Sequence, residues 1–114
     1  MTKGEFIEYC LSYPGSYEDH PFGEGWVAIR HNGNKKIFAL IFHLDGRLCV
    51  NLKCDPQRAD FLRGLFPDVK PGYHMNKEHW NTLILDGNLP EHEICDMVGH
   101  SYALTKPKNK HNSA

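Results

Sequence analysis

Histidines are the first residues of this sequence that could do chemistry, because imidazole binds metal ions and transfers protons near neutral pH. Eight occur among 114 residues. His74 and His79 are five residues apart, which fits neither one helical turn nor alternate positions on one strand face. His92-Glu93 begins like the HExxH zinc motif, but Asp96 stands where its second histidine would be. The spacing therefore favours structural or surface roles for the histidines, with a bound metal as the alternative.

The four cysteines offer a second kind of chemistry, nucleophilic attack. They form no CxxC pair and no regular framework, so we expect reduced thiols. Cys54 precedes Asp55-Pro56, a predicted helix start that could lower the thiol pKa, but the Asp55 carboxylate opposes that effect. The sequence contains no Ser-His-Asp order, P-loop or GxGxxG motif. We therefore predict no catalytic residue, metal or cofactor, and we favour a non-enzymatic protein.

Two polar segments could contact nucleic acid. Residues 31–36 place Lys35 and Lys36 at a predicted hairpin tip, which could lie along phosphates or stay merely solvated. In the second segment, residues 70–80, amide side chains could read base edges and Trp80 could stack on a base. A tryptophan at this position is also typical of a sheet core, and we favour the core for Trp80.

The charge distribution limits how strongly DNA could bind. The net charge is −1, and removing the three positive charges of Lys106, Lys108 and Lys110 leaves −4 for the rest of the chain. A protein that binds mainly by neutralising phosphates should be basic, so the composition argues against tight DNA binding. Any DNA binding should be weak, salt-dependent and confined to a local patch.

Hydrophobic periodicity and turn residues predict the elements that position these groups. Strands are separated by Asn32-Gly33 and Asp45-Gly46 turns, and helices begin at a Thr2–Glu5 capping box and at Asp55-Pro56. The second helix should bury Ala59, Leu62, Leu65 and Phe66. The predicted order is a helix, three or four strands that include a three-stranded meander, a helix, two extended segments at Val69–His74 and His79–Leu85, and a helix from near Pro90.

This order predicts the α+β class, a single domain with an antiparallel sheet and three helices. We expect residues 1–105 to form the domain and residues 106–114 to form a basic, disordered tail. Neither a signal peptide nor an apolar run long enough to span a membrane is evident, so we expect a cytoplasmic monomer with no membrane partner.

Several motifs in fixed order resemble the MmcQ/YjbR family across roughly residues 2–105. They are Asn51-Leu52-Lys53-Cys54-Asp55-Pro56, residues 71–77 (Pro-Gly-Tyr-His-Met-Asn-Lys), residues 79–82 (His-Trp-Asn-Thr), Asp86-Gly87 and Ser101-Tyr102. The resemblance implies a small α+β domain with a frataxin-like (CyaY-like) arrangement and a proposed double-wing DNA-binding motif. The positions that match the family pattern are Lys53, Tyr73, His74, Asn76, Lys77, His79, Trp80, Asn81 and Thr82.

The leading hypothesis is a non-enzymatic DNA-binding protein that uses hairpin wings. Its candidate DNA-binding residues are Lys35, Lys36, Lys53, Tyr73, His74, Asn76, Lys77, His79 and Trp80. One alternative is a small-ligand or metal-linked enzyme in which His74, His79 and Lys53 converge on a pocket. Another is a protein-interaction module. The polar signature after Pro71 could equally specify the fold, since asparagine and threonine side chains also satisfy backbone groups.

Overall fold

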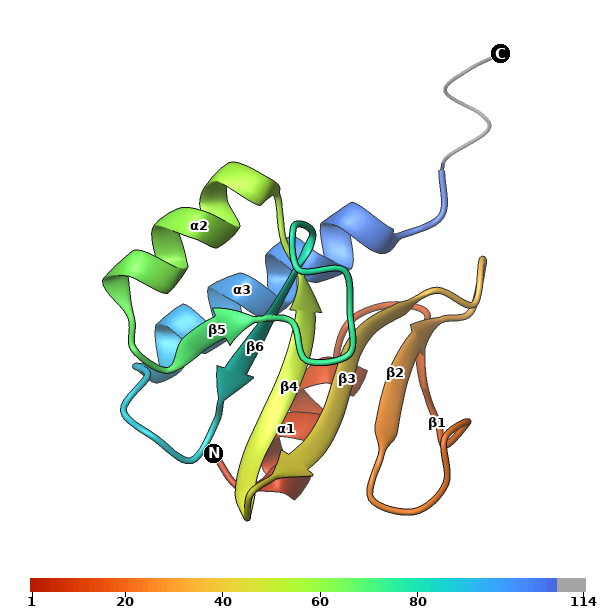
Figure 1. Cartoon of the computed structure of the whole chain (residues 1–114). Helices are drawn as coiled ribbons and strands as arrows, with labels where there is room; N and C mark the ends of the chain where they lie inside the picture. The colour runs from red at the N-terminus through yellow and green to blue at the C-terminus, as the bar shows by residue number, and fades with distance from the viewer. Residues whose placement is uncertain (109–114) are drawn as a thin grey trace.

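A six-stranded antiparallel sheet organises the protein, as the computed structural model of residues 1–108 shows (Figure 1). The strand order is β1-β2-β3-β4-β6-β5, which confirms the predicted α+β class with an antiparallel sheet and three helices. The elements are α1 (Lys3–Leu11), β1 (Ser16–Asp19), β2 (Val27–His31), β3 (Ile37–Leu44), β4 (Arg47–Lys53), α2 (Pro56–Leu65), β5 (Val69–Pro71), β6 (Trp80–Ile84) and α3 (Glu91–Thr105).

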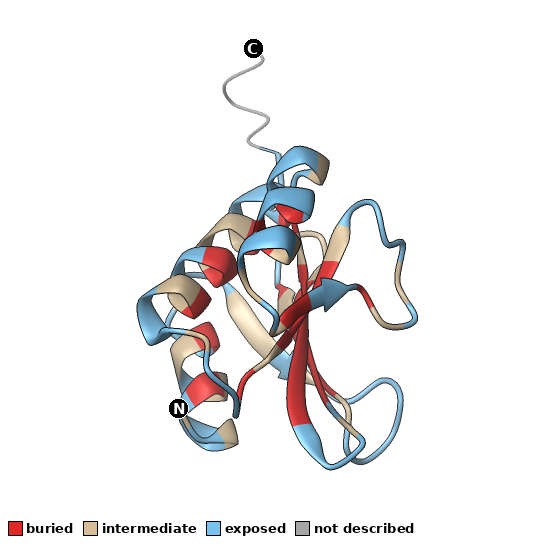
Figure 2. Cartoon of the chain, turned by 60° about the vertical axis from the view of Figure 1, so that its left-hand side comes forward, coloured by how far each residue is buried: buried red, intermediate tan, exposed pale blue. Residues whose placement is uncertain are grey.

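The three helices lie on one side of the sheet and turn their buried residues toward it (Figure 2). The predicted capping box of α1 is confirmed, with the Thr2 side chain accepting from the Glu5 amide while the Glu5 carboxylate accepts from the Thr2 amide. Asp55 caps α2, as predicted, by accepting from Gln57 N. Alternate strand residues meet these helices and form the hydrophobic core, which includes Ile29, Ile41, Val50 and Leu83.

The opposite face of the sheet has no helix over it within residues 1–108. Its floor consists of the other strand residues, because side chains alternate between faces. Asn51 of β4 pairs with Leu40 of β3 on one side and with Thr82 of β6 on the other, so these three residues share this uncovered face. Two loops flank the face, the β1–β2 loop (residues 20–26) and the β5–β6 loop (residues 72–79).

The structure corrects several expectations. The meander has four strands, since β1 pairs with β2. The extended segment predicted over Val69–His74 ends at Pro71, because the chain turns and His74 adopts a left-handed φ of 59°. Leu65 is 55% exposed rather than buried, since α2 turns it away from the sheet.

Helix α3 ends at Thr105, which is buried. Residues 109–114 of the predicted tail lie outside the described residues. None of the helices within residues 1–108 combines the length and the apolar character that crossing a membrane requires.

Candidate functional site

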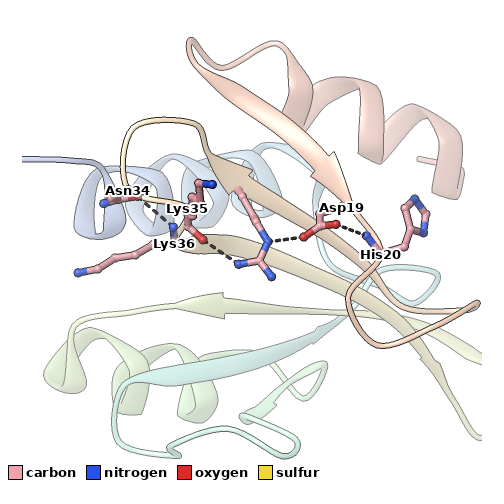
Figure 3. Close-up of polar contacts among 6 residues, drawn as sticks. Asp19, His20, Asn34, Lys35 and Lys36 are labelled. Atoms are coloured by element: carbon pink, nitrogen blue, oxygen red, sulfur yellow. Dashed lines mark hydrogen bonds and ion pairs between the residues drawn. The ribbon is translucent and has the colours of Figure 1, made fainter.

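The β2–β3 hairpin tip presents Lys35 and Lys36 on a tightly fixed backbone. Lys35 N donates to His31 O over 2.8 Å, and His31 N donates to Lys36 O over 2.9 Å. The Asn34 carboxamide oxygen accepts from Lys36 N over 3.0 Å, as Figure 3 shows. Lys35 has a left-handed φ of 61°, which is uncommon for a residue other than glycine. The asparagine therefore holds the turn, and both lysine side chains are exposed.

Arg30 braces the tip from the uncovered side of the hairpin. Its Nη1 donates to Lys35 O over 2.7 Å, and its Nε donates to Asp19 Oδ2 over 2.8 Å. Asp19 Oδ1 accepts in turn from His20 N, so the chain of contacts runs from β1 to the tip (Figure 3). Because Arg30 and Asp19 neutralise each other, the charge that the tip presents outward is that of Lys35 and Lys36.

The segment after α3 packs against the same tip. Asn34 Nδ2 donates to Thr105 O over 2.9 Å. A Cβ at Gly33 would lie 2.6 Å from Pro107 Cγ, so the two chain segments are in close contact. This packing brings Lys106 and Lys108, both exposed, beside the hairpin lysines. We call Lys35, Lys36, Lys106 and Lys108 the basic rim.

His31 forms the buried base beneath the basic rim. The residue is 2% exposed, and its ring packs against Phe38 and Tyr102 with centroid distances of 5.0 and 4.6 Å. Its Nε2 lies 2.8 Å from Thr105 Oγ1, a hydroxyl that itself donates to Ser101 O. Burial lowers the pKa of His31, and the positive charge of Lys106 lowers it further. The histidine is thus a neutral structural link between β2 and α3.

In the β5–β6 loop, unlike at the hairpin tip, both the asparagine and the lysine side chains bind the loop's own backbone. The Asn76 carboxamide oxygen accepts from Glu78 N and His79 N, at 2.9 and 3.2 Å. Lys77 Nζ donates to Gly72 O over 3.0 Å. Asn76 and Lys77, predicted as the second DNA-binding wing, therefore stabilise the loop's own backbone.

The strands beneath this loop hold it in place. Tyr73 N donates to Thr82 Oγ1 over 2.8 Å, and Asn51 Nδ2 donates to Tyr73 O over 2.9 Å. Thr82 Oγ1 in turn donates to Asn51 Oδ1. Because Asn51 and Thr82 are buried, these bonds satisfy groups that would otherwise be costly to remove from water.

Arg63 of α2 fixes the other side of the loop. Its Nε donates to the buried Asn81 Oδ1 over 2.7 Å, and its Nη2 donates to the carbonyl oxygens of Lys77 and Trp80. The matched family positions Asn76, Lys77, Asn81 and Thr82 thus support the loop.

The remaining predicted site residues do not converge on one point. Lys53 pairs with Trp80 across β4 and β6, and Trp80 is half-buried on the uncovered face instead of lying in the core. His79 is exposed, and its carbonyl accepts from Cys54 N over 2.8 Å. His74 instead lines a hollow whose lining includes neither His79 nor Lys53.

Aromatic residues border that hollow, and of these the sequence had singled out Tyr73 but not Phe22, Trp26 or Phe42. Trp26 stacks on Phe42 at a centroid distance of 4.7 Å, and Phe42 stacks on Tyr73 at 5.6 Å. Phe22, 58% exposed, meets Trp26 edge-on. Because side chains alternate along β3, the sequence could have placed Phe42 and Ile41 on opposite faces of the sheet. Only the folded structure reveals that Trp26 and Tyr73 pack against Phe42.

The cysteines, considered above as nucleophiles, are buried or half-buried. Burial raises the pKa of Cys54, the thiol considered at the start of α2, and all four cysteines are free. Burial also raises the pKa of Cys10 to about 12. Within residues 1–108, no group of three His, Cys, Asp or Glu side chains is placed to hold a metal ion.

Comparisons with known proteins agree with the fold. A family model described as YjbR matches residues 11–104. Uncharacterized protein YjbR of Escherichia coli K12 is 36% identical over 90% of this chain and 85% of its own length. Uncharacterized protein YyaQ of Bacillus subtilis is 34% identical over 93% of this chain and 99% of its own length.

Two solved structures are similar along most of the chain. A Pseudomonas syringae protein has a TM-score of 0.83 and 32% identity, covering 92% of this chain and 99% of its own. A Deinococcus radiodurans protein, described by the domain name DUF419, has a TM-score of 0.81 and 32% identity, covering 90% of this chain and 77% of its own.

Proposed function

The chain belongs to the YjbR family, and we propose that it is a non-enzymatic protein that binds DNA weakly through the basic rim. The carrying observation is that Pro107 packs on Gly33, which gathers four exposed lysines at one end of the molecule. An acidic remainder of the chain does not prevent such binding, because at physiological ionic strength charges beyond about 8 Å are largely screened.

The rim suits phosphate contacts better than base recognition. Lysine ammonium groups neutralise phosphates without reading sequence, and within residues 1–108 none of the four has an ion-pair partner. The carboxamide of Asn34, next to Lys35 in the sequence, is occupied by Lys36 N and Thr105 O. We therefore propose that the basic rim contacts the phosphate backbone of DNA with little sequence preference. Of the two predicted wings, only the β2–β3 hairpin contributes to this surface.

Fluorescence anisotropy with a short labelled duplex, measured at increasing salt, tests this proposal. If each rim lysine neutralises one phosphate, the logarithm of the association constant should fall linearly with the logarithm of the salt concentration, with a slope of about −3.6. Reversing two charges, Lys35→Glu with Lys36→Glu, should weaken binding and reduce the slope by about two.

A matched control separates the rim from overall charge. Lys70 is exposed on the edge strand β5, and β4 and β6 separate that strand from the hairpin formed by β2 and β3. Lys70→Glu should leave DNA binding nearly as strong as in the wild type, whereas Lys36→Glu, with the same change in net charge, should not. Equal weakening by both variants, or no binding at low salt, would refute the proposal.

A further inference from the structure

A hollow on the uncovered face of the sheet lies beyond the opposite end of β2 from the basic rim. It has a volume of about 310 Å³ and is lined by Phe22, Trp26, Leu40, His74 and Met75. Small-molecule sites typically begin near about 300 Å³. We call this hollow the aromatic pocket. The β1–β2 loop supplies Phe22 and Trp26, the β5–β6 loop supplies His74 and Met75, and β3 supplies the floor.

The wall supplied by the β5–β6 loop is preformed. Asn51 and Thr82 fix the backbone of Tyr73, the residue next to His74. Gly72 allows close packing, since a Cβ there would lie 2.8 Å from Trp80 Cβ and 3.2 Å from Met75 Cβ. His74 is held with its ring 4.0 Å from that of Tyr73. The loop therefore keeps His74 and Met75 against the pocket without a ligand.

The lining has the chemistry of a site for a flat ring. Trp26 lies nearly parallel to the fully buried Phe42, at 12°, and Phe22 stands at 82° to Trp26, so the two lining aromatic rings are set nearly at right angles. Met75 adds a thioether that adapts to aromatic surfaces. Among residues 1–108, no carboxylate or ammonium group lines the pocket, and the lining side chains with an N–H or ring nitrogen for hydrogen bonding are His74 and Trp26.

From this geometry we infer that the aromatic pocket binds a small, uncharged, planar aromatic compound that carries one hydrogen-bonding group toward His74. An elongated aliphatic chain would leave the ring faces poorly matched, and a charged compound would lose its hydration without gaining a partner. The pocket is separate from the basic rim, so the inference does not depend on DNA binding.

Two bicyclic alcohols test the inference with the unmodified full chain. 1-Naphthol is flat, whereas decahydro-1-naphthol has the same carbon skeleton and hydroxyl but is puckered. In ¹H–¹⁵N NMR titrations, 1-naphthol should cause saturable shifts confined to residues 22–26 and 72–75 and to the Trp26 indole. The saturated alcohol should bind roughly tenfold more weakly. Equal affinity for both alcohols, shifts centred elsewhere, or no saturable shift would overturn the inference.

A variant inside the pocket and one outside it test, independently of the NMR shifts, whether 1-naphthol binds there. Met75→Trp should fill the half-buried loop side of the pocket and reduce 1-naphthol affinity roughly tenfold. Leu104→Trp, at a site on α3 that is 44% exposed, should leave affinity unchanged. Should both variants bind 1-naphthol equally, the pocket is not the site. The double variant Lys35→Glu with Lys36→Glu should keep 1-naphthol binding, so failure of the DNA proposal and failure of this one can be distinguished.

His74→Gly tests the polar part of the inference, since glycine tolerates the left-handed backbone at this position and has no side chain that can form a hydrogen bond. The wild type should bind 1-naphthol more tightly than 1-methylnaphthalene, and the variant should lose most of that preference. A preference that survives unchanged in the variant would refute the role of His74.

Discussion

The β2–β3 hairpin tip and the β5–β6 loop contain the same polar residue types, yet their lysines act in opposite ways. Each segment combines asparagine, lysine and histidine. At the tip, Asn34 and Arg30 hold the backbone and the lysines remain available to solvent. In the loop, Lys77 itself binds a carbonyl. Polar composition therefore identifies a binding surface only after the hydrogen bonds that stabilise the turn have been assigned.

The largest effect should come from closing the space at Gly72. In Gly72→Ala the new methyl would collide with Trp80 Cβ at 2.8 Å and with Trp80 O at 2.9 Å, so the β5–β6 loop must shift. We expect a loss of about 1–3 kcal/mol in the free energy of unfolding, measured by urea denaturation. Gly64→Ala is the control, because a Cβ there meets nothing within 4 Å and alanine favours helix α2. An unchanged Gly72→Ala protein would show that the loop is loosely packed.

Removing the Arg63 anchor should have the next largest effect. Arg63→Met leaves the buried Asn81 Oδ1 without its charged donor, which costs about 1–3 kcal/mol. Amide hydrogen exchange should accelerate over residues 72–80 while the hairpin tip stays protected. Arg58→Met, an exposed site on the same helix, should have little effect. Faster exchange at the tip in Arg63→Met would contradict the separate support of the two regions.

A smaller effect should distinguish Lys77, which stabilises its own loop, from Lys36, which we propose contacts DNA. Lys77→Met should lower the free energy of unfolding by about 0.5–1.5 kcal/mol, since Gly72 O loses its donor, with DNA affinity nearly unchanged. Lys36→Met should change stability by less than about 0.5 kcal/mol yet lower the salt slope of DNA binding by about one. Urea denaturation and fluorescence anisotropy measure the two effects. The opposite pattern would place the DNA surface on the β5–β6 loop.

The smallest effect is the pH dependence of the free energy of unfolding that His31, at the base of the hairpin tip, should cause. The pKa of His31 lies below its ordinary value because of burial, so between that lowered pKa and about 6.5 the unfolded chain binds more protons. Stability from this group is thus complete above about pH 6.5 and declines as the pH falls toward the folded pKa. His100, whose pKa burial also lowers, acts in the same direction.

Urea denaturation at pH 7.5 and pH 5.5 checks this sign. His31→Gln should flatten the pH dependence, whereas His43→Gln, at an exposed site, should not. A wild type that gains stability on acidification over this range would contradict the assignment of His31 as a neutral link.

Local signals allowed much of the fold to be predicted. The capping box at Thr2 and the Asp55-Pro56 helix start are confirmed because each depends on neighbouring residues alone. The predicted extension of the strand from Val69 to His74 and the predicted placement of Trp80 in the core were wrong, because loop packing over β4 and β6 decides them.

The candidate site was less predictable for the same reason. Lys106 was treated as part of a separate tail, whereas Pro107 packs against Gly33, a residue far away in sequence. The stack of Trp26, Phe42 and Tyr73 likewise joins three separate segments of the chain. Sequence spacing carries no direct signal for such contacts.

The most direct test is to map the amide shifts that an unlabelled DNA duplex causes in the ¹⁵N-labelled protein at low salt. We expect the largest shifts to cluster at residues 32–36 and 105–108 and to disappear as salt is raised. Shifts centred on residues 72–79, or none at any salt concentration, would contradict it.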